Sequence, residues 1–406
     1  MNLLKEGIEQ KAVVKTVITR KLTVDGITRA YPVYKVRLDW LFYNDQNDRI
    51  ATWISQYKSE HNGQIPDVND MEAYNSIIDE FIVFSNPEAI QRTQKNIELV
   101  EQREPGVVLA DGRIIDGNRR FTCLRHLAQG NDRFKYFETV ILARDIENNA
   151  KQIKMLELSI QHGEENRVDY NPVDRLVGIY NDVVDTHLLS VEEYARSTNE
   201  PEAEVTRRVE IAKLMVEFLE FVNAPKQFYI ARDMQITSTL EELFKLINRC
   251  HNEDEKEDLK IAVFNNILMH TSTDMSRFVR NFKSVIGTDY QDEFLEEQKA
   301  LAERVIEKLP PVGKVNTSVI RNVIRSQADV IDEMDRSVEK AITKVRRKDT
   351  RNRPIKLVEK AADCLEDVDL NILRKMNDSE IQRLMRQISR LDTAITQLKG
   401  IIDVDA

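Results

Sequence analysis

Short runs of β-favouring residues in the first 143 positions predict a small sheet. The runs are rich in valine, isoleucine, threonine and aromatic residues, and two of their connections hold an Asp-Gly pair, Asp25-Gly26 and Asp111-Gly112. Asp-Gly supplies the positive φ angles of a two-residue hairpin turn. The predicted strands are residues 12–18, 22–36, 107–110, 113–115 and 137–143.

Apolar residues spaced three and four positions apart dominate the rest of the chain and predict helices. Asn86 before Pro87 is typical of a helix start, because asparagine caps the first turn and proline fits its first position. The predicted helices are residues 50–57, 71–84, 87–101, 119–128, 146–162, 173–184, 191–197, 202–219, 240–249, 259–269, 275–285, 294–309, 317–344, 355–365 and 378–401.

Together these elements predict an α+β protein, with a small mixed sheet in an N-terminal domain followed by a mostly α-helical body. At 406 residues the chain is long enough for two or three domains. The predicted parts are an N-terminal domain (1–163), a linker helix with a helix-turn-helix (164–224), a helical domain (225–310) and a helical tail available for oligomerisation (311–406).

The stretch from the second hairpin into the following helix is the first candidate for chemistry. Asp116-Gly117-Asn118 bends the chain sharply, and Arg119 and Arg120 begin the helix. A helix N-terminus presents unpaired N–H groups and a positive dipole end, and arginine there opposes the dipole unless an anion compensates it. The pattern indicates a phosphate site, although two arginines that are solvated or paired on an exposed first turn would give the same sequence.

A second candidate is the helix pair 191–197 and 202–219, joined by Thr198-Asn199-Glu200-Pro201. A short turn between two helices is typical of a helix-turn-helix, whose second helix reads DNA. Its outer face carries the candidate DNA contacts Thr206, Arg207, Arg208 and Lys213. Such pairs also occur as simple packing units, and the sequence leaves both interpretations open.

The tail contributes two further features. Residues 344–353 form the most basic stretch of the chain, which either contacts nucleic-acid phosphates or pairs with acidic helices. A heptad-like seam of about three heptads follows and favours self-association or packing on the body. The seam consists of Ile381, Leu384, Ile388, Leu391, Ile395 and Leu398.

The composition argues against a basic nucleic-acid-coating protein, a disulfide-rich protein and a membrane protein. The chain is 41% hydrophobic and 32% charged with a net charge of −10, so any contact with DNA must come from local patches. Cys123, Cys250 and Cys364 lack the spacing of a disulfide framework or a zinc site. With no export signal and no run of about 18 apolar residues, we expect a cytoplasmic protein without a membrane span.

Three loops and the helix pair occur in an order that resembles a known family. Residues 44–49 follow a strand and end in Arg49, residues 117–120 (Gly-Asn-Arg-Arg) open a helix, and residues 165–167 (Glu-Asn-Arg) precede Asn171-Pro172. Over residues 34–222 the chain resembles the ParB branch of the ParB/sulfiredoxin-like superfamily. Its members carry an Asn/Gln/Pro-rich loop ending in arginine, a GERR-type loop and an ENxxR-type segment before the helix-turn-helix.

The resemblance implies a bacterial, plasmid or phage DNA-associated partition or regulatory protein, in which the loops bind CTP with Mg²⁺ and a homodimer closes on DNA. Carried over by position, the nucleotide would contact Arg49, Gly117, Asn118, Arg119, Arg120 and Arg167. Glu165 and Asn166 would lie at the metal, matching the family only with a shift. Asn118 stands where the family has glutamate, and Cys123 lies inside the helix, so sulfiredoxin chemistry is not expected.

Two other functions stay open at this point. The fold also resembles phosphate-chemistry enzymes, such as nucleases, ATPases (or a CTPase-like nucleoside triphosphatase) and small-molecule kinases, in which Asp111 or Asp116 would be the acidic group. The pattern favours turn residues bonded to the local backbone for both aspartates. Alternatively, the pocket is degenerate and the helices from Leu240 onward bind a protein partner.

Overall fold

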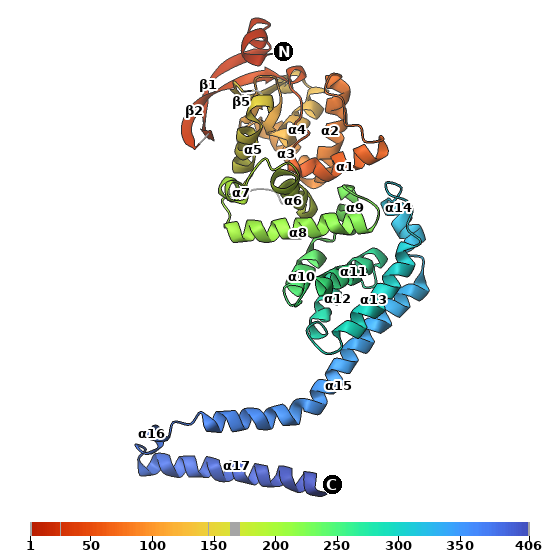
Figure 1. The fold of residues 1–406 in the computed structure, drawn as a ribbon. Coiled ribbons are helices and arrows are strands. Elements are labelled where there is room, and N and C mark those ends of the chain that lie inside the picture. Colours follow the sequence, from red (N-terminus) through yellow and green to blue (C-terminus); the bar gives the residue numbers. More distant parts are fainter. Residues whose placement is uncertain (1, 25, 145, 163–170, 405–406) are drawn as a thin grey trace. The chain divides into compact units, whose positions relative to one another are not determined.

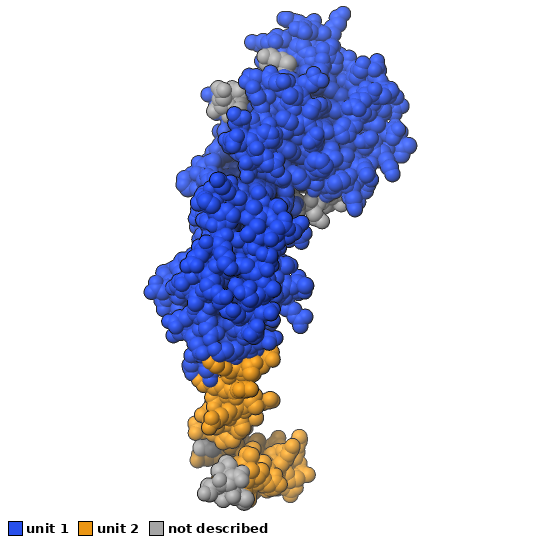
Figure 2. All heavy atoms as spheres, turned by 90° about the vertical axis from the view of Figure 1, so that its right-hand side faces the viewer, with its two compact units in different colours: residues 1–342 blue, residues 343–406 orange. Residues whose placement is uncertain are grey.

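The computed structural model describes residues 2–24, 26–144, 146–162 and 171–404. Two compact units divide the chain, residues 1–342 and residues 343–406 (Figure 2). The boundaries expected at residues 163, 224 and 310 remain sequence-based predictions. The α+β fold class is confirmed, because one five-stranded mixed sheet is followed by a body made of helices (Figure 1).

The sheet has the strand order β1-β2-β5-β3-β4. β3 and β5 run parallel, and the other neighbouring strands are antiparallel. Gly26 and Gly112 have φ angles of 74° and 99°, so both predicted hairpin turns use the glycine conformation that the sequence indicated; Asp25 lies outside the described residues. The strands are β1 (Val13–Val24), β2 (Ile27–Arg37), β3 (Gly106–Leu109), β4 (Ile114–Asp116) and β5 (Tyr136–Leu142).

Successive strand residues point to opposite sides of the sheet, and both sides carry buried apolar residues. Helices therefore cover both faces. Val108 and Phe137 face a core cluster shared with α2, α3 and α4, whereas Val107 and Val140 face a second cluster shared with α5. Asn86 accepts a hydrogen bond from the Ala89 N–H, which confirms the predicted cap of α3. The α-helices of this region are α1 (Ala51–Glu60), α2 (Met71–Ser85), α3 (Pro87–Val100), α4 (Asn118–Ala128) and α5 (Ile146–His162).

Four short helical turns accompany them. The first is a π-helical turn near the N-terminus, and the others are 3-10 turns that connect longer elements. They are η1 (Leu3–Gly7), η2 (Leu38–Trp40), η3 (Asp48–Ile50) and η4 (Asp132–Phe134).

The helical body follows the predicted order with local differences. The expected helix 173–184 is α-helical only in α6 (Pro172–Ile179) and continues as the π-helical turn η5 (Tyr180–Asp185). The short helix α9 (Phe228–Met234) was not predicted. The remaining helices are α7 (Val191–Thr198), α8 (Glu202–Phe221), α10 (Thr237–Ile247), α11 (Glu253–Met269), α12 (Met275–Asn281), α13 (Gln291–Ile306) and α14 (Thr317–Val319), with the turns η6 (Phe282–Ser284) and η7 (Ile320–Ile324).

The helices near the C-terminus correct two sequence-based boundaries. The expected helix 317–344 is interrupted after η7, and α15 (Ala328–Glu366) then runs through the basic stretch and through Pro354. Proline removes one backbone hydrogen bond, which favours a helix end in the sequence, but the turns on either side sustain the helix here. Residues 343–406 also contain α16 (Leu370–Leu373) and α17 (Asp378–Val404).

Candidate functional site

The loop before α1 presents Arg49 to a cavity. Asn47 accepts a hydrogen bond from the Arg49 N–H at 3.0 Å, which folds residues 47–50 into the turn η3. The side chains of Asn47 and Asp48 are buried. Arg49 lies at the cavity wall, held by a backbone turn that its own neighbours stabilise.

Gly117 forms the opposite side of this cavity at the start of α4. Its φ angle is 106°, a conformation that favours glycine, and a Cβ atom there would lie 2.7 Å from the ring of Phe137. Both the backbone conformation and the available space therefore require glycine. No side chain caps α4. The first N–H groups of α4 therefore have no partner within the helix, as at any helix N-terminus, so the strand, glycine turn and helix start that the sequence predicted are present.

The cavity has a volume of about 290 Å³ and unites five of the six residues predicted to bind nucleotide. It lies between η3, the C-terminal part of α2, α3, β4 and the first turn of α4. Thr93 and Gln161 also line it and were not singled out from the sequence, because neither belongs to a loop motif. The lining residues are Asn47, Arg49, Ile50, Ile82, Ser85, Thr93, Glu104, Ile115, Asp116, Gly117, Asn118, Arg119, Arg120 and Gln161.

Arg119 is a partly buried cation that faces other cations in the cavity. Burial lowers the pKa of its guanidinium to about 10, and repulsion from the cationic Arg49, Arg120 and Arg92 adds to this effect while Cys123 opposes it. Within the described parts of the chain, no carboxylate makes an ion pair with Arg119. A partly dehydrated cation among other cations is stabilised by a bound anion.

Arg120 has a different environment from its neighbour. Its guanidinium donates to the Asp116 carboxylate at 3.0 Å and to the Glu104 carbonyl at 2.6 Å. Asp116 also pairs with Arg20 at 3.1 Å. The Arg20–Asp116–Arg120 group ties β1, the end of β4 and α4 together, and Asp116 is accordingly held between two cations.

Asn118 presents a buried side-chain oxygen to the cavity. No hydrogen-bond partner for Asn118 Oδ1 occurs among the described residues. A buried acceptor without a donor is unfavourable unless a ligand or water satisfies it. It would suit a ligand hydroxyl or a water bound to Mg²⁺, a metal that takes most of its other ligands from phosphate and water.

The third predicted loop cannot be placed. Glu165, Asn166 and Arg167 lie outside the described residues. Elsewhere in the described chain there is no group of three or more histidine, cysteine, aspartate or glutamate side chains suited to hold a metal. The roles of these three residues therefore stay predictions from the family resemblance.

The helix pair α7–α8 forms as predicted, with a capping box at Ser190 and Glu193 and with Asn199 in the left-handed region at its turn. The candidate DNA contacts differ in their environments. Arg208 is 8% exposed and donates to both carboxylate oxygens of Glu200, at 2.9 and 3.1 Å. The more exposed Arg207 and Lys213 pair with Glu204 and Glu210, and the Thr206 hydroxyl donates to the Glu202 carbonyl.

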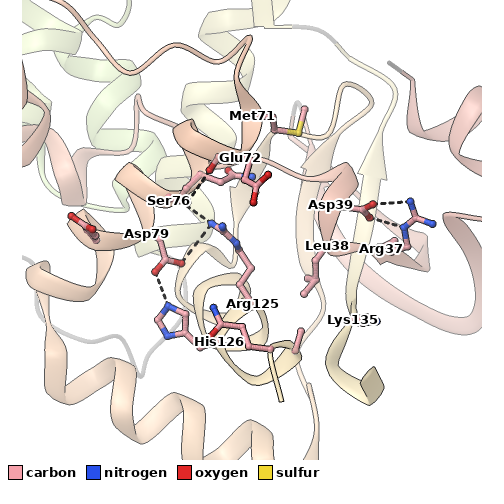
Figure 3. A pocket seen from close by; sticks show the side chains of 14 residues that line it. Arg37, Leu38, Asp39, Met71, Glu72, Ser76, Asp79, Arg125, His126 and Lys135 are labelled. Carbon is pink, nitrogen blue, oxygen red and sulfur yellow. Dashed lines mark hydrogen bonds and ion pairs between the residues drawn. The ribbon is translucent and has the colours of Figure 1, made fainter. Parts of the chain in front are cut away.

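A second, larger cavity is lined by the N-terminal half of α2 and the last turn of α4 and was not predicted. It has a volume of about 980 Å³, and its floor holds Asp79 between the His126 ring and the Arg125 guanidinium (Figure 3). The His126 Nε2 atom lies 2.7 Å from Asp79, and the Tyr43 hydroxyl donates to the same carboxylate at 2.6 Å. The hydrogen bond to Asp79 raises the pKa of His126. Sequence reasoning missed it because Asp79 and His126 belong to separate helices without a shared motif.

Asp111 and Asp116, the acidic candidates for an enzyme, both have structural partners. Asp111 accepts a hydrogen bond from the Arg113 N–H across the hairpin turn, and Asp116 belongs to the ion-pair group above. The contact of Asp111 is that of a turn-stabilising residue, whereas Asp116 makes side-chain ion pairs with Arg20 and Arg120.

Of the described helices, none combines the length and the apolarity that a membrane span requires.

Comparison with known proteins gives little further information. No family model and no curated protein matches this chain. Among solved structures, it is similar to a Pnob8-like ParB-N domain, with a TM-score of 0.38 and 13% identity, over 66% of this chain and 97% of that chain.

Proposed function

We propose that the cavity between η3 and α4 binds the triphosphate of a nucleotide, CTP in the first instance, together with Mg²⁺. The observation that carries the proposal is Arg119, a partly buried cation without a carboxylate partner among the described residues, beside Arg49 and the open N-terminus of α4. A chain of phosphates supplies the negative charge that this arrangement lacks.

Each residue has a distinct role in this proposal. Arg119 and Arg49 contact the phosphates directly, and arginine suits this role because its planar fork donates two parallel hydrogen bonds. Arg120 adds positive charge from the wall while Asp116 fixes its position. Asn118 accepts a hydrogen bond from the nucleotide or from a metal-bound water, and Mg²⁺ neutralises part of the phosphate charge.

Calorimetric titration with CTP, ATP and GTP, each with Mg²⁺, tests the proposal. We expect binding of CTP that saturates at one nucleotide per chain and that duplex DNA modulates. Preference for ATP with turnover independent of DNA would instead favour a phosphate-chemistry enzyme. Absence of binding for all three nucleotides would contradict both functions and leave the cavity as a degenerate pocket.

We further propose that the chain binds DNA through α7 and α8, as a ParB-like partition or regulatory protein does. Thr206, Arg207 and Lys213 are the contacts that reach the surface of α8, while Arg208 supports the helix pair from inside through Glu200. Since the chain has a net charge of −10, this local surface must supply the attraction to DNA phosphates.

Residues 343–406 carry the proposed self-association surface. On α17 the seam side chains Ile381, Ile388, Ile395 and Leu398 are all more than 40% exposed, although they lie on one face at heptad spacing. An apolar helical face of this kind is stabilised when a second helix covers it. We infer that α17 pairs with a second copy of the chain.

Replacing Ile388 with glutamate should convert the dimer to a monomer in sedimentation experiments, because a carboxylate in the seam must be dehydrated on pairing. Ser389→Glu adds the same charge at the next, outward-facing position and should leave the dimer intact. A wild-type chain that sediments as a monomer at all concentrations would contradict the inference.

A further inference from the structure

A buried lysine contacts the loop that carries Arg49. Lys154 of α5 is 7% exposed, and its Nζ atom lies 2.6 Å from Asp48 Oδ1, 3.4 Å from Asp182 Oδ2 and 4.0 Å from Glu157 Oε2. These carboxylates come from η3, η5 and α5 itself. One ammonium group therefore joins the cavity loop, the helix behind the sheet and the first π-helical turn of the helical body.

The turn η3 connects this lysine to the cavity. Asp48 and Arg49 are consecutive, but the Asp48 side chain enters the buried cluster while Arg49 lines the cavity. The backbone of α6 closes the cluster from the other side, because a Cβ atom on Gly178 would lie 2.5 Å from the Asp48 carboxyl carbon. Because Asp48 and Arg49 share the three-residue turn η3, a backbone shift at Asp48 also moves Arg49.

We propose that Lys154 is a positioning residue for the phosphate cavity: through Asp48 it fixes Arg49 in place, and through Asp182 it makes that position depend on η5 of the helical body. This inference rests on the proposed function. Lys154 would connect the cavity to the segment that leads into the helix pair α7–α8. The contact is suited to transmit nucleotide occupancy because a buried ion pair has few alternative arrangements.

The charge balance of the cluster makes it sensitive to pH. Burial raises the pKa of Glu157 to about 8 and of Asp182 to about 7; the charge of Lys154 opposes both shifts, and Asp48 adds to them. Glu157 also accepts a hydrogen bond from Gln161. Further charges facing the cluster are Asp174 of α6, whose pKa burial raises to about 7, and Arg232 of α9, which lowers the pKa of Asp174.

The sign of the pH effect follows from these shifts. Carboxyl groups whose pKa is raised on folding contribute stability below their unfolded values and lose it as pH rises through about 7 to 8. Above that range, ionised Asp182 and Glu157 compete with Asp48 for Lys154. Arg49 is then held less firmly, so nucleotide affinity should fall as pH rises through this window.

The experiment compares Lys154→Met with Lys151→Met, which removes a more exposed lysine one turn earlier on α5 that pairs with Glu193. Without nucleotide, hydrogen exchange of the amides of residues 49–52 should be faster in Lys154→Met and unchanged in Lys151→Met. Affinity for CTP with Mg²⁺ should fall on the order of 10-fold in Lys154→Met, the usual scale when a neighbour that orients a ligand-binding group is lost.

The outcomes separate this inference from the proposed function. If wild-type protein binds no nucleotide, the proposed function fails, and the exchange rates still report whether Lys154 holds η3. A folded Lys154→Met protein with unchanged exchange and unchanged affinity overturns the inference. If that variant does not fold, Asp182→Asn serves, since it should reduce the loss of affinity between about pH 6 and 9; an unaltered pH profile would then overturn the inference.

Discussion

Replacing Arg119 with methionine should abolish triphosphate binding and at the same time stabilise the protein without ligand. The guanidinium is the cavity group that burial and neighbouring cations destabilise most, and no described carboxylate offsets it. We expect a loss of about 2–5 kcal/mol of binding free energy, as for other charged contacts in dehydrated sites. The free energy of unfolding should rise by about 1 kcal/mol, because methionine keeps the apolar stem and removes the repulsion.

Calorimetry with CTP and Mg²⁺ measures the first effect, and denaturant unfolding of the unliganded protein measures the second. Arg133→Met is the matched control, since this exposed arginine of the same unit donates to the Glu98 carbonyl away from the cavity. It should change neither quantity appreciably. An Arg119→Met protein that is strongly destabilised and still binds nucleotide would show that the guanidinium serves the fold.

Replacing Arg208 with alanine should destabilise the protein by about 3–5 kcal/mol, the scale expected when a buried ion pair loses one partner. Burial alone would raise the pKa of Glu200, but the hydrogen bond and charge of Arg208, together with Arg175, lower it to about 2. A depressed carboxyl pKa contributes stability above its unfolded value that is lost as pH falls towards about 2. Arg208→Ala should remove much of this acid-dependent contribution.

Unfolding in denaturant at neutral and at acidic pH measures both effects. Lys213→Ala removes an exposed pair with Glu210 on the same helix and should cost less than about 1 kcal/mol. Its effect should appear in DNA affinity instead, which separates a surface contact from an internal support. Equal stabilities of the two variants would mean that Arg208 does not hold the helix pair together.

The sequence predicted most elements because their signals are local. Asp-Gly pairs specify hairpin turns by their own backbone preferences, Asn86 and Pro87 start a helix without distant help, and apolar spacing identifies the buried face of each helix. The sharp turn at Gly117 before α4 followed from the same kind of signal. Boundaries failed where a single residue's preference did not decide the backbone, as where α15 continues through Pro354 although the residues around it are mostly exposed.

The distinction between Arg119 and Arg120 could not come from the sequence, because adjacent arginines look alike there. Arg120 is bound by Asp116, which also pairs with Arg20, 96 residues away from Asp116 in the chain, whereas Arg119 faces other cations. Likewise, only the packing of α8 makes Arg208 an internal residue.

The amino-acid sequence by itself thus determined the order of most strands and helices and the presence of a glycine turn with arginines at a helix start. The tertiary structure decided which of those arginines has no carboxylate partner among the described residues, and it placed Lys154 against Asp48 and Asp182 and His126 against Asp79. The reason is physical: hairpins, caps and helical faces depend on neighbours along the chain, whereas charge compensation depends on groups that folding brings together from distant positions.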